Sequence, residues 1–104
     1  MKTTRELALP CPDNKKEELI SELQELYKSR GYEVLDIDGV RITFELHKWA
    51  LVRASNTQPK LTARFQARDE ESLQEIVTLV RDDLKHYEYV DISDLVEGLR
   101  EAIG

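Results

Sequence analysis

Cysteine is nearly absent from this 104-residue chain, and long apolar runs are missing altogether. Its one cysteine, Cys11, has no partner for an internal disulfide, as is usual for proteins in a reducing compartment. No segment approaches the roughly 20 apolar residues of a membrane-spanning helix. Residues 1–10 also lack the continuous apolar stretch of a secretory signal. We therefore expect a cytoplasmic protein that does not associate with a membrane.

Acidic residues are absent between Glu45 and Asp69, although the whole chain carries a net charge of −6. Five cations lie in that gap, which gives it a charge of +5 and leaves −11 for the rest: Lys48, Arg53, Lys60, Arg64 and Arg68. The negative total disfavours nucleic-acid binding, because phosphate neutralisation requires a basic surface. The grouped cations indicate either an anion site or basic surface strands balanced by acidic helices.

Hydrophobic patterning predicts the secondary structure of one globular domain, in which 40% of residues are apolar and 35% are charged. Alternating apolar and polar residues predict strands, at residues 5–9, 33–37, 40–46, 49–53 and 61–67. Apolar residues at helical spacing predict helices, at residues 13–30, 70–84 and 93–103.

Turn and cap residues mark the ends of these elements. Asp13 and Asp69 are expected to cap the first two helices, and Gly31 to end the first. Asp38-Gly39 predicts a two-residue hairpin, and His47-Lys48 the next turn.

The order of elements is β-α-β-β-β-β-α followed by a C-terminal helix, which predicts an α+β fold. Strands linked by hairpins form an antiparallel sheet of about five strands, and the helices at either end cover one of its faces. We expect that covered face to carry four apolar residues of the strand at 40–46: Val40, Ile42, Phe44 and Leu46.

The loop at residues 53–59, Arg-Ala-Ser-Asn-Thr-Gln-Pro, has the residue types that bind phosphate. Arg53 has a planar guanidinium that can bind two phosphate oxygens, and Ser55 and Thr57 have hydroxyl donors. Asn56 tolerates a left-handed backbone, which can turn successive N–H groups toward one anion. Arg64 lies six residues beyond the loop on the next strand, and we expect it to lean back as a supporting cation. Serine and asparagine are also common in ordinary turns, so a purely structural loop is the alternative.

Three stretches together resemble the C-terminal domain of the α-D-phosphohexomutases, in the phosphomannomutase/phosphoglucomutase branch. These stretches are Asp-Gly-Val-Arg at 38–41, Trp-Ala-Leu-Val-Arg-Ala-Ser-Asn-Thr-Gln-Pro at 49–59 and Arg-Phe-Gln-Ala at 64–67. The resemblance covers residues 7–87 and implies a TATA-binding-protein-like fold. We therefore assign residues 1–88 to the phosphate-binding domain and residues 89–104 to a helical extension packed on it.

The resemblance also implies a function. Such enzymes have four domains, and the last one holds the phosphate of a glucose or mannose 1- or 6-phosphate that is not reacting. Carried over by position, Arg53, Ser55, Asn56 and Thr57 would bind that phosphate, with Arg64 in support. The phosphoserine loop, the aspartates that bind Mg²⁺ and the sugar-reading loop of the family are absent from these residues. We therefore expect no catalytic residue, no metal and no cofactor here, and no mutase activity without the other three domains.

Two alternatives belong to other functional classes. The first is a stand-alone interaction or regulatory module that kept the fold without the enzyme. The second is a nucleic-acid-binding domain, which would require exposed aromatic residues among the cations. Only Trp49 and Phe65 lie in the basic stretch, and Phe65 falls in its apolar phase, so the sequence disfavours this second alternative.

Overall fold

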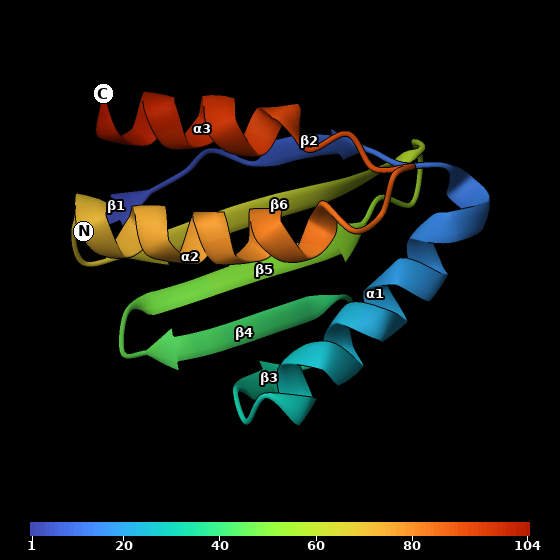
Figure 1. Ribbon diagram of the computed structural model, residues 1–104, viewed down its shortest axis with the longest axis horizontal. Coiled ribbons are helices and arrows are strands. Elements are labelled where there is room, and N and C mark those ends of the chain that lie inside the picture. The colour runs from blue at the N-terminus through green and yellow to red at the C-terminus, as the bar shows by residue number, and fades with distance from the viewer.

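A computed structural model describes residues 1–104, and it folds as one antiparallel sheet with three helices on a single face (Figure 1). The elements in chain order are β1 (Lys2–Thr3), β2 (Leu7–Pro10), α1 (Asp13–Ser29), β3 (Glu33–Leu35), β4 (Val40–Glu45), β5 (Lys48–Ala54), β6 (Lys60–Ala67), α2 (Glu70–Leu84) and α3 (Ser93–Ile103). The α+β class and the order of the long elements are confirmed. The sheet has six strands because the short β1, which the sequence did not reveal, joins it.

β6 lies near one edge of the sheet and pairs with three other strands. β1 and β2 share one side of β6, and β5, β4 and β3 follow in order on its other side. The long pairing of β5 with β6 sets Ala50 opposite Phe65 and Arg53 opposite Thr62. Because side chains alternate along a strand, this register places Ala50 and Phe65 on one face of the sheet and Arg53 and Thr62 on the other.

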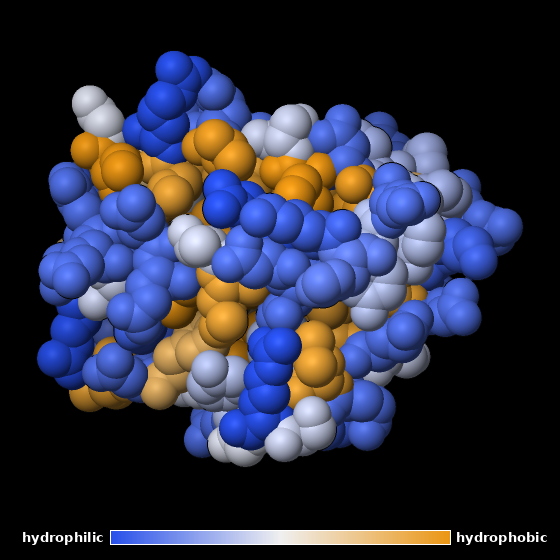
Figure 2. Space-filling view, in the orientation of Figure 1, coloured by the Kyte–Doolittle hydropathy of each residue, from blue (hydrophilic) through white to orange (hydrophobic).

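The helices cover the apolar face and leave the other face open. Along β6, Leu61, Ala63, Phe65 and Ala67 are buried, whereas the residues between them are not. The core is completed by apolar residues from α1 and α2, including Leu19, Leu23, Tyr27, Leu73, Ile76 and Val80. Figure 2 shows the helix-bearing side: hydrophilic residues cover α2, and apolar residues appear in strips on either side of it.

The predicted apolar face of β4 is only partly correct. Val40 and Ile42 are fully buried, and Phe44 packs against the core from a half-buried position. Leu46, however, is 69% exposed. It lies beyond the end of β4 in the turn to β5, so the alternation that placed it on the covered face no longer applies.

Both predicted turns differ in length or position from the structure. Four residues separate the ends of β3 and β4, so Asp38-Gly39 forms the tip of a longer hairpin. The two-residue turn is instead Leu46-His47, in which His47 has a φ of 64° and Glu45 pairs with Lys48. Asp38 and Gly39 have φ angles of 60° and 125°, a backbone geometry that favours glycine and aspartate over larger residues.

The helix ends confirm two of the three predicted signals. Asp69 caps α2 by accepting a hydrogen bond from the Ser72 N–H at 2.8 Å. Gly31, with a φ of 86°, follows Arg30, the C-cap of α1, in a Schellman motif. Asp13 is not the cap, because Pro12 occupies that position and Asp13 is the first helical residue.

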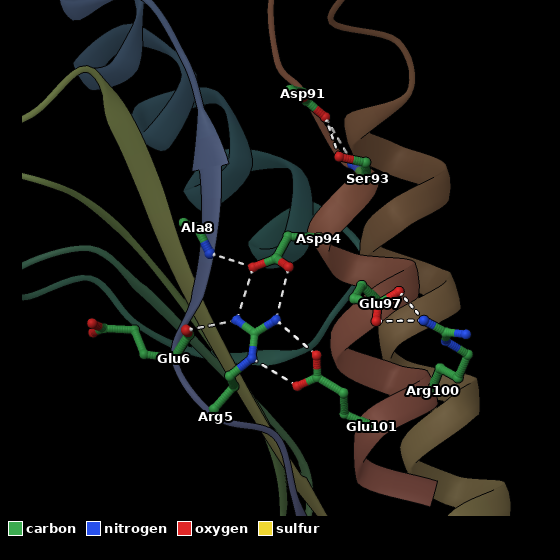
Figure 3. A network of polar contacts seen from close by, with 9 residues as sticks. All are labelled: Arg5, Glu6, Ala8, Asp91, Ser93, Asp94, Glu97, Arg100 and Glu101. Atoms are coloured by element: carbon green, nitrogen blue, oxygen red, sulfur yellow. Dashed lines mark hydrogen bonds and ion pairs between the residues drawn. The ribbon is translucent and has the colours of Figure 1, made fainter. Parts of the chain in front are cut away.

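A polar network fastens α3 to β2 (Figure 3). The Asp94 carboxylate accepts two hydrogen bonds from Arg5, at 2.9 and 3.0 Å, and a third from the Ala8 N–H at 2.9 Å. Arg5 also donates to Glu101 at 2.8 Å, and its contact with Asp94 lowers the pKa of that carboxyl. Gly98 allows α3 to lie close to β2, because a Cβ there would come within 2.2 Å of Leu7 Cδ2.

No helix in the structure combines the length and apolar character that crossing a membrane requires.

Candidate functional site

A polar cleft of about 430 Å³ lies beside the β5–β6 loop, at the end of the open face of the sheet. Only one of its lining residues is hydrophobic. The lining comes from the loop and the strand ends beside it: Glu6, Arg53, Ala54, Ser55, Asn56, Thr57, Gln58, Lys60 and Thr62. Four of the five residues predicted for the site therefore surround one cavity, namely Arg53, Ser55, Asn56 and Thr57.

Backbone hydrogen bonds close the base of the loop. Ser55 N–H donates to the Lys60 carbonyl at 3.0 Å, and Lys60 N–H donates to the Gln58 carbonyl at 2.8 Å. Cys11 N–H donates to the Pro59 carbonyl at 3.0 Å and so ties the loop to the segment between β2 and α1. The loop is thus a short, braced turn whose ends are held by the sheet.

The Ser55 side chain holds the tip of the loop. Its hydroxyl oxygen accepts hydrogen bonds from the N–H groups of Thr57, at 3.4 Å, and Gln58, at 3.3 Å. Asn56 does not adopt the left-handed conformation expected from the sequence, since Asp38 and His47 are the non-glycine residues with positive φ. The serine hydroxyl turns the backbone, so a left-handed residue is not needed.

Arg53 extends from β5 on the open face and reaches toward the β3–β4 hairpin. Its guanidinium forms an ion pair with Asp38 at 2.8 Å, and 42% of its side chain is exposed. The Nε atom of Arg53 is buried and has no hydrogen-bond acceptor. Gly39 lies against the same side chain, because a Cβ at Gly39 would come within 2.8 Å of Arg53 Cγ. The hairpin tip thus fixes where the arginine lies.

Arg64 is on the same face of the sheet but does not line the cleft. It is paired with Leu51, two positions farther from the loop than the Arg53–Thr62 pair, and it is exposed. The other cations of the basic stretch also separate in space. Lys60 lines the cleft, whereas Lys48 is buried on the helix-bearing face and pairs with Glu75 at 2.8 Å. The +5 stretch is therefore divided between the two faces of the sheet.

The charge around the cleft is mixed, and Asp38, outside the lining, pairs with the Arg53 cation. Arg53 and Lys60 contribute cations, and Glu6 contributes one carboxylate at the rim. In Figure 3 the Glu6 side chain points away from the Arg5 network. No group of three or more His, Cys, Asp or Glu side chains is arranged to hold a metal ion. The donors present suit an anion and do not suit Mg²⁺, which prefers carboxylate and water oxygens.

Sequence reasoning missed the part of the cleft that is distant in the chain. Glu6 reaches the loop because β2, which follows it, pairs with β6, and no local motif reveals that pairing. Lys16, on α1, also contacts the loop, through the carbonyls of Ser55 and Gln58, without lining the cleft. Its only sequence signal is a lysine in the first turn of a helix, which is too common to be informative.

Comparison with known proteins shows that most of this chain matches a known protein family. The family model "Phosphoglucomutase/phosphomannomutase, C-terminal domain" matches residues 6–83, which include the whole loop and exclude α3. A phosphomannomutase/phosphoglucomutase of Pseudomonas aeruginosa is 37% identical over 83 residues, or 80% of this chain and 18% of the relative. That of Pseudomonas putida is 36% identical over 86 residues, 83% of this chain and 18% of the relative.

Relatives named for a different sugar also match. A probable phosphoglucosamine mutase of Methanosphaera stadtmanae is 35% identical over 69 residues, which are 64% of this chain and 15% of that protein. The chain thus spans less than a fifth of the length of these relatives, at the domain shared by enzymes named for different sugars.

Proposed function

The chain belongs to the phosphoglucomutase/phosphomannomutase family as its C-terminal domain, and we propose that its cleft holds the phosphate group of a hexose phosphate. The observation that carries the proposal is the set of donors around one cavity. Arg53, Ser55, Asn56 and Thr57, whose side chains can all donate hydrogen bonds, line it within the segment that the family model matches.

Each donor has a distinct part in holding the phosphate. The Arg53 guanidinium is a fork that can match two phosphate oxygens. One of its nitrogens pairs with Asp38 at 2.8 Å, so a bound phosphate would share the guanidinium with that carboxylate. The Ser55 oxygen accepts from two N–H groups, so its own hydrogen is free to point into the cleft. Lys60 adds positive potential at the rim, and Arg64 adds a more distant charge from the same face.

Within a complete mutase this domain would position the substrate and leave phosphoryl transfer to the other domains. Its His, Cys, Asp and Glu side chains form no group of three or more that could hold a metal ion. Binding the non-reacting phosphate supplies binding energy away from the reacting centre and orients the sugar. We infer that the isolated domain is inactive, that Mg²⁺ is held by another domain, and that the enzyme interconverts glucose or mannose 1- and 6-phosphates. A cytoplasmic location also belongs to this proposal, supported by the single unpaired cysteine.

A titration of this chain with inorganic phosphate, followed by amide NMR, tests the proposal. With only one wall of the site present, we expect a Kd on the order of millimolar, equivalent to about −4 kcal/mol. Arg53→Ala should weaken binding at least about tenfold, because a charge-assisted hydrogen bond contributes about 1.5–3 kcal/mol. In a full-length mutase the same change should lower kcat/KM by about 10²-fold.

Two matched variants make the test specific. Arg64→Ala removes the same charge from the same face but away from the cleft, so it should change the Kd less than about threefold. Glu6→Gln removes the carboxylate at the rim and should strengthen binding slightly. Equal losses for Arg53→Ala and Arg64→Ala would indicate non-specific attraction to the open face. Absence of phosphate binding would favour the interaction-module alternative.

A further inference from the structure

We propose that Lys16, which contacts the β5–β6 loop but does not line the cleft, is a positioning residue that sets the loop in its phosphate-binding conformation; this inference rests on the function proposed above. Lys16 lies in the first turn of α1, far from the loop in sequence. Its ammonium donates hydrogen bonds to the carbonyls of Ser55 and of Gln58, the latter at 3.0 Å, and pairs with Asp13 at 2.8 Å.

The Lys16 ammonium is largely buried and has three partners. Its side chain is only 11% exposed, and burying an ammonium is costly unless it has partners. It donates hydrogen bonds to two loop carbonyls and forms an ion pair with the Asp13 carboxylate. Lys16 is also not among the residues that line the cleft. We therefore infer that Lys16 acts on a bound phosphate through the loop.

The contact determines which way a peptide group of the loop faces. In a planar trans peptide the C=O and N–H bonds point in opposite directions. Because the Ser55 carbonyl points at Lys16, the N–H of Asn56 in the same peptide points away from Lys16. That N–H donates to no protein acceptor, and Asn56 lines the cleft. Lys16 thus fixes the direction of a backbone N–H that has no protein acceptor, in a residue that lines the cleft, and backbone N–H groups of this kind bind anions in other proteins.

A purely structural role for Lys16 predicts different behaviour. If the lysine only stabilised the fold, its loss would lower the free energy of unfolding without changing the affinity of the folded protein for phosphate. A positioning role predicts lower affinity and a more mobile loop in protein that remains folded. The two roles are separated by measuring binding, loop order and stability on the same variants.

The experiment compares Lys16→Met with two controls in the 104-residue chain. Lys15→Met makes the same charge change on an exposed neighbour, and Val80→Ala lowers stability from the core of α2. We expect Lys16→Met to raise the Kd for inorganic phosphate about tenfold. We also expect it to lower the amide order parameters of Asn56 and Thr57 without ligand and to abolish the phosphate-induced shift of the Asn56 amide. Both controls should bind phosphate within about twofold of the original protein.

The outcomes separate this inference from the proposed function. The role of Lys16 is overturned if Lys16→Met binds phosphate as tightly as the original protein does. It is also overturned if Val80→Ala loses as much affinity as Lys16→Met. Neither result would affect the proposed phosphate site. Absence of binding by the original protein refutes the proposed function instead, and the Lys16 proposal fails with it. If Lys16→Met does not fold, Lys16→Gln replaces it, because glutamine can donate to one carbonyl without the charge. An intermediate loss of affinity then supports the role, and unchanged affinity overturns it.

Discussion

Gly39 is the position where one added methyl group should disturb both the fold and the cleft. It has a φ of 125°, and a Cβ built on it would lie 2.6 Å from the Val52 carbonyl oxygen and 2.8 Å from Arg53 Cγ. The oxygen belongs to the backbone of β5, inside the sheet, and cannot retreat cheaply. Gly39→Ala therefore combines backbone strain with steric overlap beside the proposed phosphate ligand.

Gly31 provides a control that isolates the backbone contribution. It also has a positive φ, 86°, but a Cβ there would meet nothing within 4 Å. Gly31→Ala should cost about 1 kcal/mol for the left-handed conformation alone. Gly39→Ala should cost about 2–6 kcal/mol, the sum of about 1–3 for strain and about 1–3 for overpacking.

Thermal unfolding measures the difference directly. At about 4–8 °C per kcal/mol for a domain of this size, Gly31→Ala should lower the Tm by about 4–8 °C and Gly39→Ala by about 10 °C or more. Gly39→Ala should also weaken phosphate binding at a temperature where it is folded, since Arg53 must shift, whereas Gly31→Ala should not. Equal Tm values for the two variants, or unchanged phosphate binding in Gly39→Ala, would refute the argument that the hairpin tip positions Arg53.

Two further substitutions test how the helices are held. Burial alone would raise the pKa of Asp83, but hydrogen bonds from Arg30 and Tyr27 outweigh it and lower that pKa below the ordinary 3.8. The ionised carboxylate therefore stabilises the fold above about pH 4, and this contribution is lost as the pH falls through the lowered pKa. Asp83→Asn should lower the free energy of unfolding by about 1–3 kcal/mol at pH 7, and this difference from the original protein should shrink below pH 4. A difference in the free energy of urea unfolding that stays constant from pH 7 to pH 2 would contradict this. Gly98→Ala should lower stability by about 1–2 kcal/mol although alanine favours helices, because its Cβ would overlap the fully buried Leu7. We expect faster amide hydrogen exchange in Gly98→Ala, confined to α3 and β2. An increase in stability would instead show that α3 can move away from β2 without cost.

Those parts of the molecule that depend on local patterns could be predicted from the sequence. α3 begins at Ser93 and ends at Ile103 as expected, because its apolar residues keep helical spacing over the whole range. The Asp69 cap is a local feature, because its carboxylate accepts a hydrogen bond from the backbone N–H only three residues later, that of Ser72. The loop at 53–59 is contiguous, so its donors arrive together in space for the same reason that they are adjacent in the chain.

Contacts between distant segments could not be predicted in this way. Lys16 meets the loop because α1 crosses the sheet beside it, and Asp38 meets Arg53 because the β3–β4 hairpin folds over β5. Neither contact leaves a periodic or local signal. The placement of Arg64 shows the same limit, since its distance from the loop depends on the β5–β6 register. β1 has two residues, too few to show any alternation.

The measurement that tests the central claim most directly is an amide shift map of this chain with three ligands: inorganic phosphate, glucose 1-phosphate and glucose. A phosphate-binding domain that does not read the sugar predicts similar shifts for the two phosphates, concentrated at Arg53, Ser55, Asn56 and Thr57, and none for glucose. Shifts that follow glucose, or that scatter over the open face of the sheet, would contradict the assignment of this loop as the phosphate-binding element.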